Sequence, residues 1–155
     1  MKNDAFYRDK KLHIYFADDD QDDIDFFKLA VQEISKEIKI TIAKDGFELL
    51  EFLQVVIPDI IFLDLNMPRM NGIDCLKEIR KQKKYDELPV IIYSTTAEQH
   101  QVDLLYSLGA NMYIQKPETF TKIKDQITQT LSLSMHDLVP QPPKEKFLIA
   151  MQKQL

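Results

Sequence analysis

Apolar and polar positions follow two alternating patterns along the chain. Short apolar runs, typical of buried strands, are separated by longer stretches in which apolar residues recur every three or four positions, as on amphipathic helices. The predicted strands are 12–17, 38–43, 59–64, 88–94 and 111–115. The predicted helices are 24–34, 45–53, 71–83, 96–109 and 119–133. The chain therefore repeats a strand–helix unit five times.

This alternation predicts the α/β class. Because the connections are short, the strands are expected to be parallel and the helices to cover both faces of the sheet. We therefore expect a five-stranded parallel sheet with helices on both faces. The run "DIIFLD" at 59–64 is apolar on both faces, which is typical of a central strand. Ligands of such sheets bind at the carboxyl ends of the strands, near the point where the strand order reverses.

Local signals predict individual helix ends. Asp45 and Glu48 have the spacing of a capping box at the start of the second helix. Thr95 and Glu98 have the same spacing before the fourth helix, so we interpret Thr95 mainly as a cap. Gly109 stands where that helix should end, which favours a C-cap.

The pattern changes after residue 133, which we predict to end a domain spanning 11–133. Residues 134–155 are expected to form a proline-containing linker and a short amphipathic segment. The stretch 144–155 can form a short helix, which is marginal alone and needs a surface on the domain, a second copy or a partner. The apolar residues near one face of that helix are Phe147, Met151 and Leu155.

Composition narrows the classes of function. The 155 residues suffice for one domain with a hydrophobic core, and the formal net charge is −5. An acidic balance disfavours nucleic acid as a direct partner, because DNA and RNA sites need clustered Lys and Arg. No apolar run approaches the ~18 residues of a membrane span, and the first residues lack the apolar core of a signal peptide. With Cys75 as the single cysteine, no internal disulfide forms, and we expect a cytoplasmic location.

Carboxylates gather at the predicted strand ends. Asp18 and Asp19 follow the first strand, and Asp64 follows the third. Like charges this close raise one another's pKa unless something compensates them. Mg²⁺, which takes carboxylate oxygens at about 2.0–2.1 Å, would do so. Asp19 with Asp20 is an alternative acidic pair, while Asp20, Asp22 and Asp23 are otherwise interpreted as the solvated start of a helix, which the helix dipole favours.

Four separated motifs, in order, resemble the receiver domain of two-component response regulators. The motifs are "YFADDDQDD", "IIFLDLNMPRMNG", "PVIIYSTTA" and "YIQKP", and the resemblance covers roughly 11–133. It implies a flavodoxin-like fold and a phosphoacceptor signalling switch that turns over no separate substrate. Asp64 matches the aspartate that accepts the phosphoryl group, Asp18 and Asp19 match the acidic pair that holds Mg²⁺, and Asn66 matches the residue whose backbone carbonyl is a metal ligand.

The same resemblance implies four further roles. Ser94 matches the hydroxyl that turns toward the phosphoryl group, and Lys116 matches the lysine that pairs with it. Pro117 follows in the loop, where the family usually has a cis Lys–Pro bond. Tyr113 matches the aromatic residue whose rotamer changes with activation. Ser94 and Tyr113 would then form the switch.

The resemblance also implies partners. A histidine kinase or phosphotransfer protein would donate the phosphoryl group, and a downstream protein would bind the face formed by 96–108, 111–115 and 119–133. A second copy of the chain is an alternative partner. Neither nucleic acid nor a membrane is expected.

Three rival functions are less compatible with the residues. A dehalogenase-type phosphatase needs an aspartate two residues after the nucleophile, where this chain has Asn66. A flavin binder needs a Ser/Thr/Gly-rich phosphate loop after the first strand, where this chain has "DDDQDD". An interaction module of receiver fold that works without phosphorylation stays as the alternative, and the complete set of matching residues disfavours it.

Overall fold

The computed structural model describes residues 11–133 and 135–149. One sheet of six parallel strands has the order β2-β1-β3-β4-β5-β6. The strands are β1 His13–Ala17, β2 Lys39–Ala43, β3 Ile60–Leu63, β4 Val90–Ser94, β5 Met112–Gln115 and β6 Leu148–Ile149. The α-helices are α1 Gln21–Ile34, α2 Gly46–Val55, α3 Gly72–Arg80, α4 Gln99–Ser107, α5 Phe120–Leu131 and α6 Met135–Leu138, and the 3₁₀ helices are η1 Lys83–Tyr85 and η2 Lys144–Lys146.

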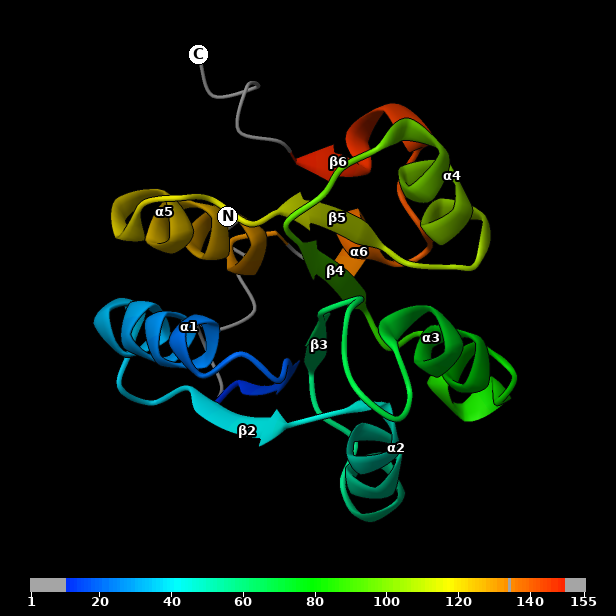
Figure 1. Cartoon of the computed structure of the whole chain (residues 1–155), viewed down its shortest axis with the longest axis horizontal. Helices are drawn as coiled ribbons and strands as arrows, with labels where there is room; N and C mark the ends of the chain where they lie inside the picture. The colour runs from blue at the N-terminus through cyan, green and yellow to red at the C-terminus, as the bar shows by residue number, and fades with distance from the viewer. Residues whose placement is uncertain (1–10, 134, 150–155) are drawn as a thin grey trace.

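The helices cover the sheet on both faces, as Figure 1 shows. Helices α1 and α5 pack together on one face, and α2, α3 and α4 lie on the other. Each face has its own hydrophobic core. The predicted α/β class, with five strand–helix units in a flavodoxin-like arrangement, is confirmed.

The strand order places β1 beside β3 at the centre of the sheet. The chain leaves β1 in one direction to form β2 and returns on the other side of β1 to form β3. All four residues of β3 are fully buried, as expected for a strand that is apolar on both faces. The order therefore reverses between β1 and β3, and their carboxyl ends meet where such sheets bind ligands.

Two of the three predicted helix-end signals are confirmed. The Asp45 side chain accepts from the backbone N–H of Glu48 at 2.9 Å, and Gly109 adopts a φ of 98° after the end of α4. The prediction for Thr95 was wrong, because α4 begins only at Gln99 and Glu98 precedes it without a side-chain cap. Thr95 instead lies in the loop that leads from β4 to that helix.

The C-terminal part differs from the prediction. Over the described residues the stretch from 144 forms η2 and β6 rather than an amphipathic helix, while Met151 and Leu155 lie outside the described residues. The physical reason is the free edge of β5: it offers backbone groups to pair with, and a short isolated helix cannot outweigh them. Helix α6 lies within the predicted linker. The division at 133 remains a prediction.

Every helix in the described residues is too short or too polar to span a bilayer.

Candidate functional site

Three carboxylates converge at the carboxyl ends of β1 and β3. Asp18 is fully buried, Asp64 is 5% exposed, and Asp19 is exposed. One oxygen from each lies within 4.8 Å of the others. The backbone fixes this arrangement, since the N–H of Asp64 donates to the carbonyl of Ala17 at 2.9 Å. The three residues are the ones that the sequence predicted to share a site.

Asp20 has a different role. Its side chain accepts from the N–H of Asp23 at 3.1 Å and so caps α1, while its own N–H donates to Oδ1 of Asp18 at 3.0 Å. The cluster in the described residues therefore contains Asp18 and Asp19, not Asp19 and Asp20.

Lys116 is the cation of the site. It follows β5, and its backbone N–H donates to the backbone carbonyl of Ser94 at 2.7 Å. Its ammonium group lies 3.3 Å from Oδ1 of Asp64, 2.9 Å from Oδ2 of Asp18 and 2.7 Å from Oδ2 of Asp23. The side chain is only 9% exposed, so these charges interact with little solvent screening.

Asp23 is the residue that the sequence pattern did not reveal. It was interpreted as part of a solvated helix start, yet it makes the shortest ion pair of Lys116. Its position in the sequence could have indicated this role. Asp23 stands in the first turn of α1, three residues after the cap Asp20, so its side chain lies on the same side of the helix as the cluster.

The charges of the site do not balance. Burial raises the pKa of Asp64 to about 6, an effect that Lys116 opposes and the nearby Asp18 reinforces. Burial also raises the pKa of Asp18. Although burial alone would lower the pKa of Lys116, the surrounding carboxylates raise it. Three carboxylates thus contact one ammonium group and Asp19 adds a fourth to the cluster, so the excess negative charge together with the three converging oxygens fits a hard divalent cation.

A second group of residues links the site to β5. Ser94 is fully buried at the end of β4, and its Oγ accepts from the N–H of Thr96 at 3.3 Å. The hydroxyl of Tyr113, also fully buried, donates to the carbonyl of Thr96 at 2.8 Å. Gln101 on α4 donates to the same hydroxyl at 3.2 Å. The two predicted switch residues therefore contact the same loop residue.

The loop after β3 contains Asn66, which the sequence predicted to take part in the site. Asn66 lies in this loop with its side chain exposed, and the role of its carbonyl stays a prediction. Gly72 closes the loop: its N–H donates to the carbonyl of Leu65 at 3.0 Å. A Cβ at position 72 would lie 2.2 Å from the carbonyl oxygen of Asp64, so only glycine allows this approach.

Pro117 is buried directly after Lys116. The cis Lys–Pro bond implied by the resemblance is not found: in the described ranges, the cis bond is Val139–Pro140. The trans form is the intrinsically favoured one, and from it the ammonium group of Lys116 contacts Asp18, Asp23 and Asp64.

Comparison with known proteins identifies the family of the fold. Residues 14–128 match the response regulator receiver domain, and the chain belongs to this family. Receiver domains are phosphoacceptor signalling switches of two-component systems. The chain is 29% identical over 148 residues to the sensory transduction protein LytT of Oceanobacillus iheyensis, covering 94% of this chain and 58% of that protein.

Other relatives agree with this assignment. A chemotaxis protein CheY homolog of Campylobacter jejuni is 35% identical over 72 residues, which is 46% of this chain and 55% of the relative. Response regulator SaeR of Staphylococcus aureus is 32% identical over 105 residues, which is 68% of this chain and 44% of the relative. The chain thus spans about half the length of the curated relatives it matches.

Solved structures share the fold. The response regulator domain of Thermotoga maritima CheB has a TM-score of 0.70 at 26% identity and covers 82% of this chain and 98% of its own. The phosphorylated cyanobacterial phytochrome response regulator RcpA has a TM-score of 0.73 at 22% identity, with coverages of 86% and 98%. The second likeness shows the fold alone.

Proposed function

We propose that this chain is the phosphoacceptor of a two-component phosphorelay and that Asp64 carries the phosphoryl group. The observation that supports this most is the convergence of Asp64 with Asp18 and Asp19, opposite the ammonium group of Lys116 at 3.3 Å. A histidine kinase or phosphotransfer protein supplies the phosphoryl group, and the modified domain changes its affinity for a downstream protein.

The chemistry follows from the residue types. The ionised carboxylate of Asp64 needs no general base to attack phosphorus. Its Oδ forms the new P–O bond while the P–N bond of the donor phosphohistidine breaks, and the electron pair stays on the imidazole nitrogen, which takes up a proton. Lys116 places a positive charge where the equatorial phosphoryl oxygens gain negative charge. Apart from the nucleophilic carboxylate of Asp64, the protein therefore contributes position and charge.

We propose Mg²⁺ as the cofactor. Asp18, Asp19, Asp64 and the carbonyl of Asn66 are the groups that would hold it. When bound, the ion neutralises carboxylate and phosphoryl charge together. The side chains of Asp18 and Asp19 would hold the ion beside Asp64, and Lys116 would offset the charge that remains.

Phosphorylation would redistribute the contacts of Lys116 and Ser94. A phosphoryl group adds about −1.5 to −2 charges. Lys116, which Asp18 and Asp23 share before transfer, would turn toward the new oxygens. The buried hydroxyl of Ser94 would turn in the same direction and leave the N–H of Thr96. The loop between β4 and α4 would then change shape, which alters the face that a partner binds.

We propose the face formed by α4, β5 and α5 as the surface for the downstream protein, and no nucleic acid or membrane as a direct partner. A location in the cytoplasm, where histidine kinases use ATP, follows from the proposed donor. We further propose that the chain turns over no separate substrate.

The proposed function is tested by incubating the full chain with acetyl phosphate and Mg²⁺ and measuring its intact mass. We expect a gain of one phosphoryl group that EDTA prevents and that Asp64→Asn abolishes. Asp22→Asn, which removes an exposed carboxylate from the same end of α1, serves as the control and should retain the gain. No gain in the wild type, or a gain that persists in Asp64→Asn, would contradict the proposal.

A further inference from the structure

Residues 138–149, called here the C-terminal segment, wrap around the outer edge of β5. Leu138 is fully buried in the core on the side of α1 and α5. Phe147 is fully buried in the core on the opposite side, with α2, α3 and α4. Figure 1 shows β6 alongside β5 and η2 next to α4. The segment therefore covers the face assigned above to the downstream protein.

Hydrogen bonds hold the first half of the segment. The amide of Asn111 donates to the carbonyl of Leu138 at 2.7 Å. The side-chain amide of Gln141 donates to the carbonyl of Tyr106, in the last turn of α4, and to that of Ala110, just after the helix. The hydroxyl of Tyr106 donates to the carbonyl of Pro142 at 2.9 Å. These contacts are specific, because each partner is a defined backbone or side-chain group.

The second half pairs with β5 and buries an aromatic ring. The N–H of Tyr113 donates to the carbonyl of Phe147 at 2.9 Å, and Leu148 lies opposite Tyr113 in the parallel register. The ring of Phe147 meets the rings of Tyr106 and Tyr113 edge-on, at centroid distances of 5.1 and 6.1 Å. Phe147 thus packs directly on Tyr113, one of the two predicted switch residues.

One ion pair adds charge complementarity. Lys144 lies 2.8 Å from Asp103 on α4, and this hydrogen bond lowers the pKa of the Asp103 carboxyl. Both side chains are well exposed, so the pair adds more to the choice of register than to stability.

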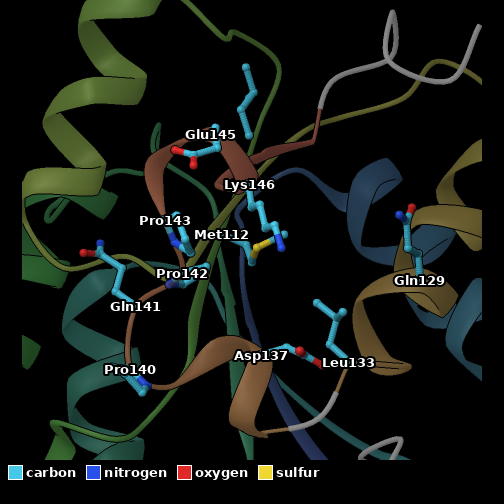
Figure 2. A pocket seen from close by; sticks show the side chains of 11 residues that line it. Met112, Gln129, Leu133, Asp137, Pro140, Gln141, Pro142, Pro143, Glu145 and Lys146 are labelled. Atoms are coloured by element: carbon cyan, nitrogen blue, oxygen red, sulfur yellow. The ribbon is translucent and has the colours of Figure 1, made fainter.

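Burial along the segment is discontinuous, because Leu138, Pro142 and Phe147 are buried while Pro140 and residues 143–146 are exposed. A cavity of about 590 Å³ lies between the segment, Met112 on β5 and the last turn of α5, which contributes Gln129. Figure 2 shows the cavity, with Pro140 to Pro143 and Lys146 on the side of the segment and Gln129 and Leu133 on the other. Because Pro140 and residues 143–146 are exposed, the segment can leave the domain at a lower cost than a continuous core element.

A short chain of contacts joins Phe147 to the phosphoacceptor site. Phe147 packs on Tyr113, the hydroxyl of Tyr113 donates to the carbonyl of Thr96, and the N–H of Thr96 donates to Ser94. Turning the hydroxyl of Ser94 toward a phosphoryl group on Asp64 removes the last of these bonds. The loop that holds Tyr113 beneath Phe147 then loses its bond to Ser94.

We propose that the C-terminal segment covers the face formed by α4 and β5 of its own domain and that phosphorylation of Asp64 releases it. The second half of this inference rests on the function proposed above. Its contacts also define the partner that fits the exposed face. That partner presents an extended strand to β5, with a basic residue three positions before a buried aromatic residue, as Lys144 stands before Phe147.

The occupancy is tested without phosphorylation, by hydrogen exchange of the Tyr113 amide in the full chain. We expect Phe147→Ala to speed exchange on the order of tenfold or more, because this N–H donates to the segment. Lys144→Asp should speed it by a smaller factor, and combining it with Asp103→Lys should restore protection. Phe26→Ala, which removes an exposed ring from α1, is the control and should change nothing. Equal protection in wild type, Phe147→Ala and Lys144→Asp would overturn the proposal.

The coupling is tested with Mg²⁺ and beryllofluoride as the phosphoryl analogue. We expect the wild type, but not Asp64→Asn, to bind the analogue by ¹⁹F NMR and to lose protection at the Tyr113 amide. If the analogue binds and protection is unchanged, the coupling is wrong while the proposed function stands. If the analogue does not bind, the proposed function itself fails.

A synthetic peptide with the sequence of the segment, "LVPQPPKEKFLI", tests whether the site is shared. It should bind full-length Phe147→Ala and the beryllofluoride form of the wild type, and not the unmodified wild type. Equal binding to all three would overturn the proposal. So would light scattering that shows a dimeric wild type and a monomeric Phe147→Ala, because a second copy would then supply the segment.

Discussion

Two regions of the domain, the carboxyl ends of β1 and β3 and the outer edge of β5, bury residues with opposite effects on stability. At the first, Asp18 and Asp64 are buried with like charges around them, and burial raises the pKa of both. At the second, Phe147 is buried among the rings of Tyr106 and Tyr113, and its carbonyl accepts a strand hydrogen bond. The acidic end is arranged to bind charge at a cost in stability, whereas the β5 edge gains stability from the segment that covers it.

The largest effect is expected at the β5 edge. Phe147→Ala should lower the free energy of unfolding by about 3 kcal/mol, because it removes a fully buried ring between two aromatic neighbours. Urea unfolding followed by circular dichroism measures the change. Phe26→Ala, at a ring that is 48% exposed, should cost much less. Equal losses in the two variants would mean that the segment adds no stability.

The acidic end should respond in the opposite direction. Asp64→Asn should raise the free energy of unfolding in EDTA at neutral pH by roughly 1–3 kcal/mol, because it removes a charge that burial disfavours. Thermal and urea unfolding both report this gain. A loss of stability instead would show that the ion pair with Lys116 outweighs the burial of the charge.

A pH dependence of stability follows from the same carboxyl group. The pKa of Asp64 is about 6 in the folded protein, above its ordinary value of 3.8, so folding favours the protonated form. This contribution is complete below the ordinary value and is lost as the pH rises through about 6. In EDTA, the free energy of unfolding should therefore fall as the pH rises from about 4 to about 6, and fall less in Asp64→Asn. An equal slope in both proteins would place the titrating group elsewhere.

The smallest expected effect is that of the metal. Mg²⁺ at ten times its dissociation constant should raise the free energy of unfolding by about 1.4 kcal/mol, since it binds only the folded cluster. Asp19→Asn removes one of the three converging carboxylates and should weaken this stabilisation strongly. Asp22→Asn should leave it unchanged. Stabilisation by Mg²⁺ that survives in Asp19→Asn would argue against the cluster as the binding site.

The difference between the two regions also explains which parts of the site could be predicted from the sequence. Asp18, Asp19, Asp64 and Lys116 were predicted to share a site because each follows a strand, and the ends of parallel strands meet at one edge. Asp23 was missed because it lies on a helix, where its direction depends on how α1 packs.

The β5 edge could not be predicted in this way. The prolines of the C-terminal segment indicate only a local break in secondary structure. The pairing of Tyr113 with Leu148 joins residues far apart in the sequence. The position of Phe147 inside a core depends on that pairing rather than on any periodic pattern. The start of α4 was misplaced for a related reason, since the backbone of Thr96, the first residue of the predicted helix, bonds Tyr113 and Ser94 instead.

The most direct test of the account is the chemical position of the phosphoryl group. Sodium borohydride reduces an aspartyl phosphate to homoserine, and tandem mass spectrometry of the digested chain locates the new residue. After treatment with acetyl phosphate and Mg²⁺, we predict homoserine at position 64, and none when EDTA replaces Mg²⁺. Homoserine at another aspartate, with Asp64 unmodified, would contradict the account.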